Sequence, residues 1–195
     1  THTTMHDFAS MRALPNLTIL APCDAVQTEY LTDLLCQFTG PVYMRMGRGD
    51  VPPVYEAGEK FEIGKIKTVC EGTDATIIAC GEMVAPAKKA AELLQAEGIS
   101  VRVLDCFTIQ PMDTKTVEKA LRETRAVVTV EEHSTRGGLG EAVSHIAAEL
   151  RGSAPMRLLG LPEEVVIGKS QELFAYYGLT PEGISAAIKE RLERE

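Results

Sequence analysis

The sequence lacks long apolar runs and long basic runs. Its longest apolar stretches, such as residues 75–80, are far shorter than the roughly 20 residues that span a bilayer. It holds 28 Asp and Glu against 20 Lys and Arg, a formal charge of −8, which argues against a nucleic acid or an anionic membrane surface as the main partner. Its first residues show no basic segment followed by an apolar one, as a secretory signal would. We therefore expect a cytoplasmic protein that binds small solutes or other proteins.

Paired cysteines are also missing. The five cysteines are odd in number, no C-x-x-C pair occurs, and two of them lie inside apolar strand-like runs. Zinc sites need closely spaced soft ligands, which this sequence does not offer. We expect free, buried thiols in a reducing compartment, and neither a metal site nor a disulfide framework.

The composition is otherwise that of an ordinary globular protein. The 195 residues are 45% hydrophobic and 25% charged, which excludes disordered and collagen-like chains. Since domains commonly contain roughly 100–150 residues, the length allows one domain, or one domain with a piece of another.

Strands and helices alternate from about residue 74 onward. Helix ends are marked by Gly98, by Asp113 as an N-cap, and by Thr180 followed by Pro181. A further segment, residues 63–69, alternates apolar and polar side chains and predicts an edge strand that could be antiparallel. Such alternation builds a mostly parallel sheet covered by helices on both faces, a three-layer α/β/α domain. The buried strands are predicted at residues 76–80, 101–106, 126–131 and 156–161.

The first 55 residues follow a different plan. They predict helices at residues 7–14 and 24–38 and strands at 17–21 and 42–46, followed by a linker rich in Gly and Pro. Two strands and two helices make only half of a sheet. We therefore expect residues 1–55 to be the C-terminal fragment of one α/β domain and residues 56–195 to form a complete second domain.

Two arginines and one histidine are the first candidates for ligand binding. Arg45 and Arg48 flank the end of a predicted strand, where open α/β sheets gather ligands, and two guanidinium groups there suit a phosphate. The alternative is a pair of solvated surface arginines. His2 and His6 lie four residues apart but have no third metal ligand nearby. Contact between His2 and an anion or a sugar hydroxyl is the better hypothesis.

A glycine-rich loop follows the strand at residues 126–131 and leads into a helix. Its backbone N–H groups could bind an anion, but it lacks G-x-G-x-x-G and the P-loop lysine, so a tight structural turn is favoured. Glu131 and His133 could form an acid/base pair, although no nucleophile lies nearby, and an interface or packing role is favoured. The candidate residues of this anion or interface loop are Glu131, His133, Gly137, Gly138 and Gly140.

Several stretches together resemble the transketolase family. Residues 1–3 leading into 11–25, and residues 40–49, resemble the closing part of the pyrimidine-binding domain of enzymes that depend on thiamine diphosphate. Residues 61–65, 103–113 and the strand and loop of residues 130–140 resemble the transketolase C-terminal domain. The resemblance covers nearly the whole chain and is strongest to separately encoded C-terminal sections of bacterial or archaeal transketolases.

The resemblance implies a fold and an activity. The fold is a partial α/β pyrimidine-binding domain followed by a three-layer α/β/α domain with a mostly parallel five-stranded sheet. The activity is transfer of a two-carbon ketol unit between sugar phosphates with thiamine diphosphate and Mg²⁺. His2 matches a histidine that lines the family's substrate channel. Either Arg45 or Arg48 matches the family's phosphate-binding arginine.

The sequence also departs from the family pattern. Thr3 stands where many relatives have Gln, no G-D-G…N metal motif occurs, and the Glu that activates the cofactor would precede Thr1. The resemblance therefore implies a chain that is inactive alone, binds no cofactor by itself, and works with an upstream transketolase section, as a homodimer. Alternatives are the corresponding part of a deoxyxylulose-phosphate synthase or a 2-oxo acid dehydrogenase β component, and a non-catalytic ligand-binding or interaction module.

Overall fold

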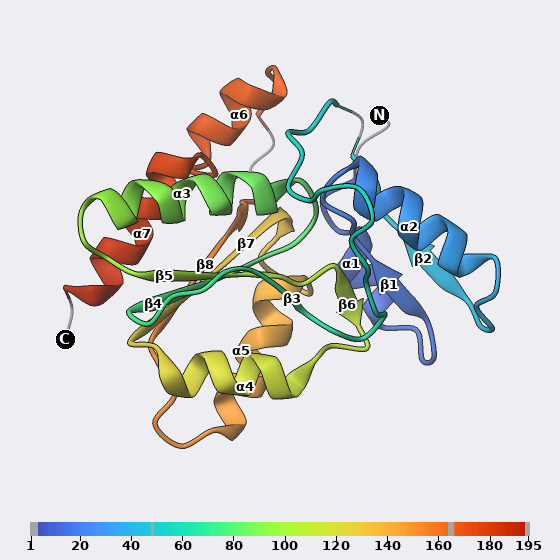
Figure 1. Ribbon diagram of the computed structural model, residues 1–195, viewed down its shortest axis with the longest axis horizontal. Helices are drawn as coiled ribbons and strands as arrows, with labels where there is room; N and C mark the ends of the chain where they lie inside the picture. Colours follow the sequence, from blue (N-terminus) through green and yellow to red (C-terminus); the bar gives the residue numbers. More distant parts are fainter. Residues whose placement is uncertain (1–3, 48, 164–165, 194–195) are drawn as a thin grey trace.

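A mostly parallel five-stranded sheet forms the centre of the molecule in the computed structural model, which describes residues 4–47, 49–163 and 166–193. Its strand order is β3-β5-β4-β7-β8, and only the edge strand β3 is antiparallel to its neighbour (Figure 1). Every predicted strand of this sheet is confirmed, although β3 begins four residues later than expected. The strands are β3 (Lys67–Cys70), β4 (Ala75–Ala79), β5 (Val101–Asp105), β7 (Ala126–Ser134) and β8 (Met156–Leu161).

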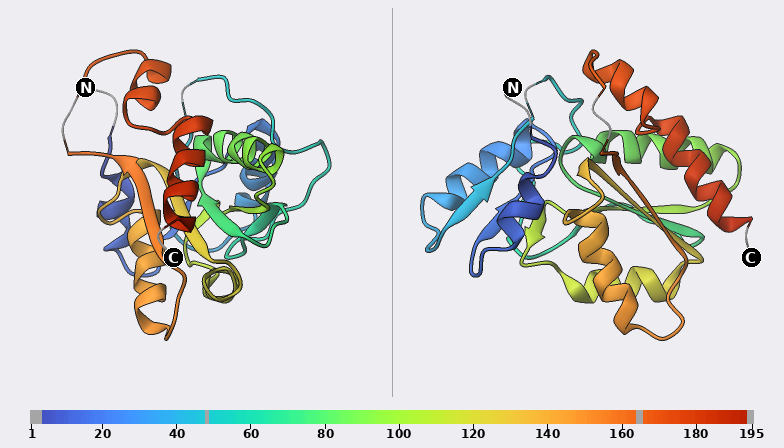
Figure 2. Two further views of the ribbon diagram at one scale, coloured as in Figure 1. Left: turned by 90° about the vertical axis from the view of Figure 1, so that its left-hand side faces the viewer. Right: turned by 180° about the vertical axis from the view of Figure 1, so that it is seen from behind.

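Helices cover both faces of this sheet, which confirms the three-layer prediction. The helices α3 (Val84–Ala96) and α7 (Pro181–Leu192) pack together on one face, and α4 (Thr114–Glu123) and α5 (Leu139–Glu149) on the other (Figures 1 and 2). Each face has its own apolar core.

The predicted helix ends are also confirmed. The Asp113 side chain accepts from the backbone N–H of Thr116, and the Thr180 side chain accepts from that of Gly183. Gly98, just beyond α3, has φ +84°, a conformation that favours glycine. Local capping chemistry therefore sets where these helices begin or end.

The N-terminal part contains the helices and strands that its periodicity predicts. They are α1 (Asp7–Arg12), β1 (Thr18–Leu20), α2 (Ala25–Leu35) and β2 (Val42–Met44). The strands β1 and β2 pair in parallel, and they lie beside one end of the large sheet (Figure 1).

A short strand from the second half of the chain completes this small sheet. The strand β6 (Thr108–Gln110) pairs antiparallel with β1, so the order is β2-β1-β6. The sequence does not predict β6, because three residues are too few for a periodic pattern. The small sheet is therefore shared between the two parts of the chain.

Two further features complete the fold. The helix α6 (Ser170–Tyr176), which precedes α7, is not predicted from the sequence. No helix within the described residues is long and apolar enough to cross a membrane.

Free thiols are confirmed, but only three of the five are buried: Cys23, Cys80 and Cys106 are buried, Cys70 is half-buried and Cys36 is exposed.

Candidate functional site

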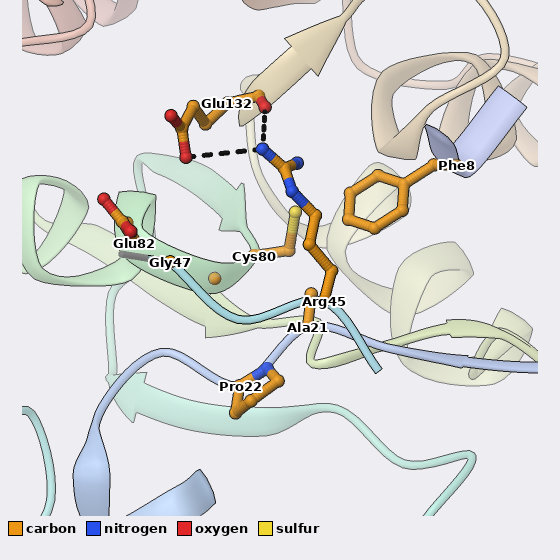
Figure 3. Close-up of a pocket in the computed structure, with 9 residues that line it drawn as sticks. Phe8, Ala21, Pro22, Arg45, Gly47, Cys80, Glu82 and Glu132 are labelled. Atoms are coloured by element: carbon orange, nitrogen blue, oxygen red, sulfur yellow. Dashed lines mark hydrogen bonds and ion pairs between the residues drawn. The ribbon is translucent and has the colours of Figure 1, made fainter. Parts of the chain in front are cut away.

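The carboxyl ends of strands from both sheets meet at one place. Ala21 follows β1, Arg45 follows β2, Cys80 follows β4, and Glu132 lies near the end of β7 (Figure 3). Together with Phe8 of α1 they line a cavity of about 20 Å³. Open α/β sheets gather ligands at their strand carboxyl ends, so this junction is the candidate site.

Arg45 is the central cation of this junction. Its Nη2 donates to the backbone oxygen of Glu132 at 2.7 Å and lies 3.4 Å from the Oε2 of the same residue. The guanidinium carbon lies 5.0 Å from the ring centroid of Phe8, a cation–π contact (Figure 3). The side chain is only 18% exposed. Arg45 is therefore not a solvated surface arginine, whereas Arg48 and His2 lie outside the described residues.

Asp7 supports Arg45 from the first turn of α1. Its Oδ2 lies 3.6 Å from Nε of Arg45 and accepts a 2.9 Å hydrogen bond from the Tyr43 hydroxyl. Burial, together with the hydrogen bond to Asp7, raises the pKa of Tyr43, so this hydroxyl stays a donor. Tyr43 of β2 thus holds Asp7 in place, and Asp7 in turn faces Arg45, which follows the same strand.

Carboxylates surround the Arg45 guanidinium. Besides Asp7, they are Glu132 and Glu82, which line the same cavity. Burial raises the pKa of both glutamates, and the positive charge of Arg45 opposes that rise. An anionic ligand of Arg45 would therefore meet carboxylates that already neutralise it.

The loop after β7 holds an internal carboxylate. Glu131 is buried, and its two oxygens accept 2.7 Å hydrogen bonds from the backbone N–H groups of Leu139 and Gly140, at the start of α5. Burial raises the pKa of Glu131 to about 7, although both hydrogen bonds favour the charged form. The N–H groups that could have received a ligand are thus bonded to the protein itself.

His133 joins β7 to α1. Its Nδ1 lies 2.6 Å from the backbone oxygen of Ser134 and so carries the proton, while Nε2 accepts from the N–H of Ala9 at 3.4 Å. Its ring stacks on Phe8 with centroids 4.9 Å apart, and burial lowers its pKa. Nδ1 lies 3.6 Å from Oε2 of Glu131, so the two residues of the possible acid/base pair are close together. Both side chains are fully buried.

The glycines of the loop allow α1 to pack closely. Arg12 of α1 donates from Nη1 to the backbone oxygens of Gly137 at 2.6 Å and Gly138 at 3.1 Å. A Cβ on Gly137 would lie 2.4 Å from that of Ala9, and one on Gly138 would lie 2.0 Å from Oε2 of Glu131. A Cβ on Gly140 would also be crowded, at 2.9 Å from the Thr129 side chain. The loop therefore serves as the surface on which α1 packs.

A second buried cluster, with no role assigned from the sequence, surrounds Asp105 at the end of β5. Its Oδ2 accepts from Gln27 at 2.7 Å and from the Tyr55 hydroxyl at 2.8 Å. Asp24 accepts from the backbone N–H of both Val54 and Tyr55 and also caps α2. Burial raises the pKa of Asp105 to about 7. An aspartate at the end of a strand whose other residues, apart from Arg102, are apolar is the sequence signal that could have identified it.

Neither cluster offers a metal site. Within residues 4–47, 49–163 and 166–193, no group of three or more His, Cys, Asp or Glu side chains could hold a metal ion. His6, the described member of the histidine pair, lies near His133 instead, with ring centroids 6.4 Å apart.

Comparisons with known proteins match the whole chain to one family. Residues 1–53 match the model for the transketolase pyrimidine binding domain, and residues 64–184 match that for the transketolase C-terminal domain. An apulose-4-phosphate transketolase subunit of Phocaeicola vulgatus is 45% identical over 196 residues, which are 100% of this chain and 62% of that protein. The 6-deoxy-6-sulfo-D-fructose transketolase subunit SqwH of a Clostridium species is 35% identical over 100% of this chain and 61% of that protein.

A solved structure agrees with these matches. A split gene transketolase, described as an inactive beta4 tetramer, superimposes with a TM-score of 0.89 and 40% identity, over 98% of this chain and 62% of that one. The chain thus spans about three fifths of the length of these relatives.

Proposed function

Since the chain belongs to the transketolase family, we propose that it is the C-terminal section of a transketolase that transfers a two-carbon ketol unit between sugar phosphates. The observation that carries this proposal is the extent and order of the match, which runs through both domains over nearly the whole chain. Relatives that the chain matches over about three fifths of their length carry names of separate transketolase subunits.

We assign residues 1–55 to the end of the pyrimidine-binding domain and residues 56–195 to the C-terminal domain. The two family models leave a gap between residues 53 and 64, which supports a boundary there. The sharing of β6 with the small sheet supports a rigid joint between the two parts.

Thiamine diphosphate and Mg²⁺ belong, in this proposal, to the assembly and not to this chain alone. The described residues do not fit the diphosphate and its metal, since they include no cluster that could hold a metal ion. The loop N–H groups at α5 are also bonded to Glu131. When bound between sections, the cofactor would supply the carbanion that accepts the ketol unit.

Arg45 is our candidate for binding the phosphate of the sugar, with His2 and Arg48 as further candidates. Arg45 lies at a strand carboxyl end and borders a cavity, the position at which open sheets bind anions. A guanidinium binds phosphate oxygens through paired N–H groups. Glu131, His133, Gly137, Gly138 and Gly140 would hold the joint and not the substrate.

The proposed function also implies partners and a location. We propose an upstream transketolase section that carries the G-D-G…N motif, a homodimer of the combined sections, and a cytoplasmic location. The isolated chain would be inactive, and its own contribution would be the scaffold of the assembly and contacts to the sugar phosphate.

Reconstitution tests this function. The chain would be mixed with an upstream section from a split transketolase, and ketol transfer between sugar phosphates measured with and without thiamine diphosphate and Mg²⁺. We expect transfer only when both sections and both cofactors are present. A stable complex that uses a 2-oxo acid donor instead would favour the synthase or dehydrogenase alternative. Stabilisation of the lone chain by a nucleotide, without any effect of the upstream section, would favour a ligand-binding module.

A further inference from the structure

Glu132 contacts Arg45 in two ways that differ in quality. The backbone oxygen accepts from Nη2 at 2.7 Å, within the usual range of roughly 2.7–3.2 Å for such bonds. The carboxylate oxygen lies at 3.4 Å from the same nitrogen, beyond that range. The backbone contact therefore fixes Arg45, and the carboxylate is the weaker of its two contacts with this residue.

The Glu132 carboxylate is less enclosed than that of Asp7. Its side chain is 27% exposed, whereas that of Asp7 is 4% exposed and is bonded to Tyr43. Burial also raises the pKa of Glu132, so its charge is not fully compensated where it lies. Of the carboxylates that contact Arg45, Glu132 is thus the one that can be displaced.

Glu132 also separates two cavities. It lines the small cavity at Arg45 and a second one of about 600 Å³, which is bordered by Met5, His6, Leu161 and α6. Figure 3 shows its carboxylate beside the guanidinium, at the rim of the small cavity. A turn of this side chain towards the larger cavity would expose the guanidinium without disturbing the backbone bond.

We propose that the Glu132 carboxylate is a specificity-determining group that competes with the substrate phosphate for Arg45. This inference rests on the proposed function, in which Arg45 binds a sugar phosphate. A carboxylate and a phosphate use the same guanidinium N–H groups, so only one of them can occupy a given face. A phosphate dianion displaces the single negative charge of Glu132, while a neutral or singly charged donor does not. Glu132 thereby weakens the binding of phosphorylated donors and leaves that of unphosphorylated donors unchanged, so it sets how strongly the site prefers a phosphate.

Glu132→Gln tests this role because it removes the charge and keeps the size and the backbone bond. In the reconstituted assembly we expect KM for phosphorylated donors to fall roughly two- to fivefold, as for the loss of a weak ion pair such as this one at 3.4 Å. The kcat, and KM for unphosphorylated ketoses, should stay unchanged. The exposed Glu149→Gln, which removes the same charge from the far end of α5, is the matched control. An unchanged or raised KM for phosphorylated donors would overturn the inference.

A binding measurement on the full chain keeps the test independent of turnover. Thermal shift with inorganic phosphate, against chloride at equal ionic strength, should show tighter binding by Glu132→Gln than by the wild type. Adding Arg45→Ala to Glu132→Gln should abolish that gain, and a gain that persists would contradict competition at Arg45.

The two proposals can fail separately. If Arg45→Ala raises KM equally for phosphorylated and unphosphorylated donors, Arg45 does not bind the substrate phosphate. That result would also overturn the proposed competition by Glu132. If Arg45→Ala affects phosphorylated donors alone while Glu132→Gln changes nothing, only the role of Glu132 falls.

Discussion

The Tyr55 hydroxyl donates a 2.8 Å hydrogen bond to Oδ2 of Asp105, where the segment that links the two parts of the chain crosses the end of β5. Gln27 of α2 donates to the same oxygen at 2.7 Å. Residues from the N-terminal part, the linker and the large sheet thus meet on one buried carboxyl group. The linker that Gly and Pro residues mark in the sequence is thus anchored at its C-terminal end by Tyr55.

The Asp105 carboxyl should make stability depend on pH. Burial raises its pKa to about 7, above the value of roughly 3.9 in an unfolded chain. Between these values the folded protein binds a proton that the unfolded chain has lost, so the contribution of Asp105 to stability falls as pH rises from about 4 to about 7. Asp105→Asn should therefore raise Tm more at pH 8 than at pH 5.5, by roughly 4–8 °C for a difference of about 2 kcal/mol between the two pH values. Calorimetry at both pH values measures this.

The control for that prediction is Asp33→Asn, on the exposed face of α2. It should shift Tm little at either pH. A gain for Asp105→Asn that is equal at pH 5.5 and pH 8 would mean that ionisation of Asp105 is not the cause.

Gly138→Ala should destabilise the junction of α1 with β7. The added Cβ would lie 2.0 Å from Oε2 of Glu131 and 2.7 Å from Nδ1 of His133, and both side chains are buried. Overpacking of this kind costs roughly 1–3 kcal/mol. Gly49→Ala is the control, because nothing lies within 4 Å of its Cβ position. Denaturant unfolding compares the two variants, and equal midpoints would contradict the close packing.

Arg12→Ala should loosen the glycine loop. Arg12 donates from one nitrogen to two carbonyl oxygens, those of Gly137 and Gly138. Bonds to a charged group contribute roughly 1.5–3 kcal/mol, so their loss should speed amide hydrogen exchange in residues 135–138. Arg12→Lys should recover part of the protection, and Arg122→Ala, exposed on α4, should have no effect there. Unchanged exchange in Arg12→Ala would show that the loop is held by other contacts.

The five thiols should react in order of exposure. Cys36 is exposed and Cys70 half-buried, whereas Cys23, Cys80 and Cys106 are buried. Burial also raises the pKa of Cys80 and Cys106, which disfavours the reactive thiolate. A thiol reagent should therefore label Cys36 first, Cys70 more slowly, and the others only in denaturant. Cys36→Ser should remove the fast phase, and a fast phase that remains would contradict this order.

Local patterns were sufficient to predict most of the large domain. Its buried strands are compact apolar runs, and Asp113, Thr180 and Gly98 mark helix ends through contacts within a few residues. The strand β6 escaped prediction because it has only three residues and its partner β1 lies about ninety residues away in the chain. Periodicity reports which face of a segment is buried, and not which distant segment covers it.

The sequence by itself determined the three-layer fold, the order of the two parts and the position of Arg45 at a strand end. Only the tertiary structure decided what these groups face. Glu132 lies 87 residues from Arg45, and His133 lies 124 residues from Ala9, yet each pair is joined by a hydrogen bond. Such contacts depend on how α1 and the small sheet pack against the large one, and no local pattern contains that information. The same packing places the carboxylate of Glu131 against the N–H groups at the start of α5, a contact that the favoured interpretation of this loop as a tight turn does not contain.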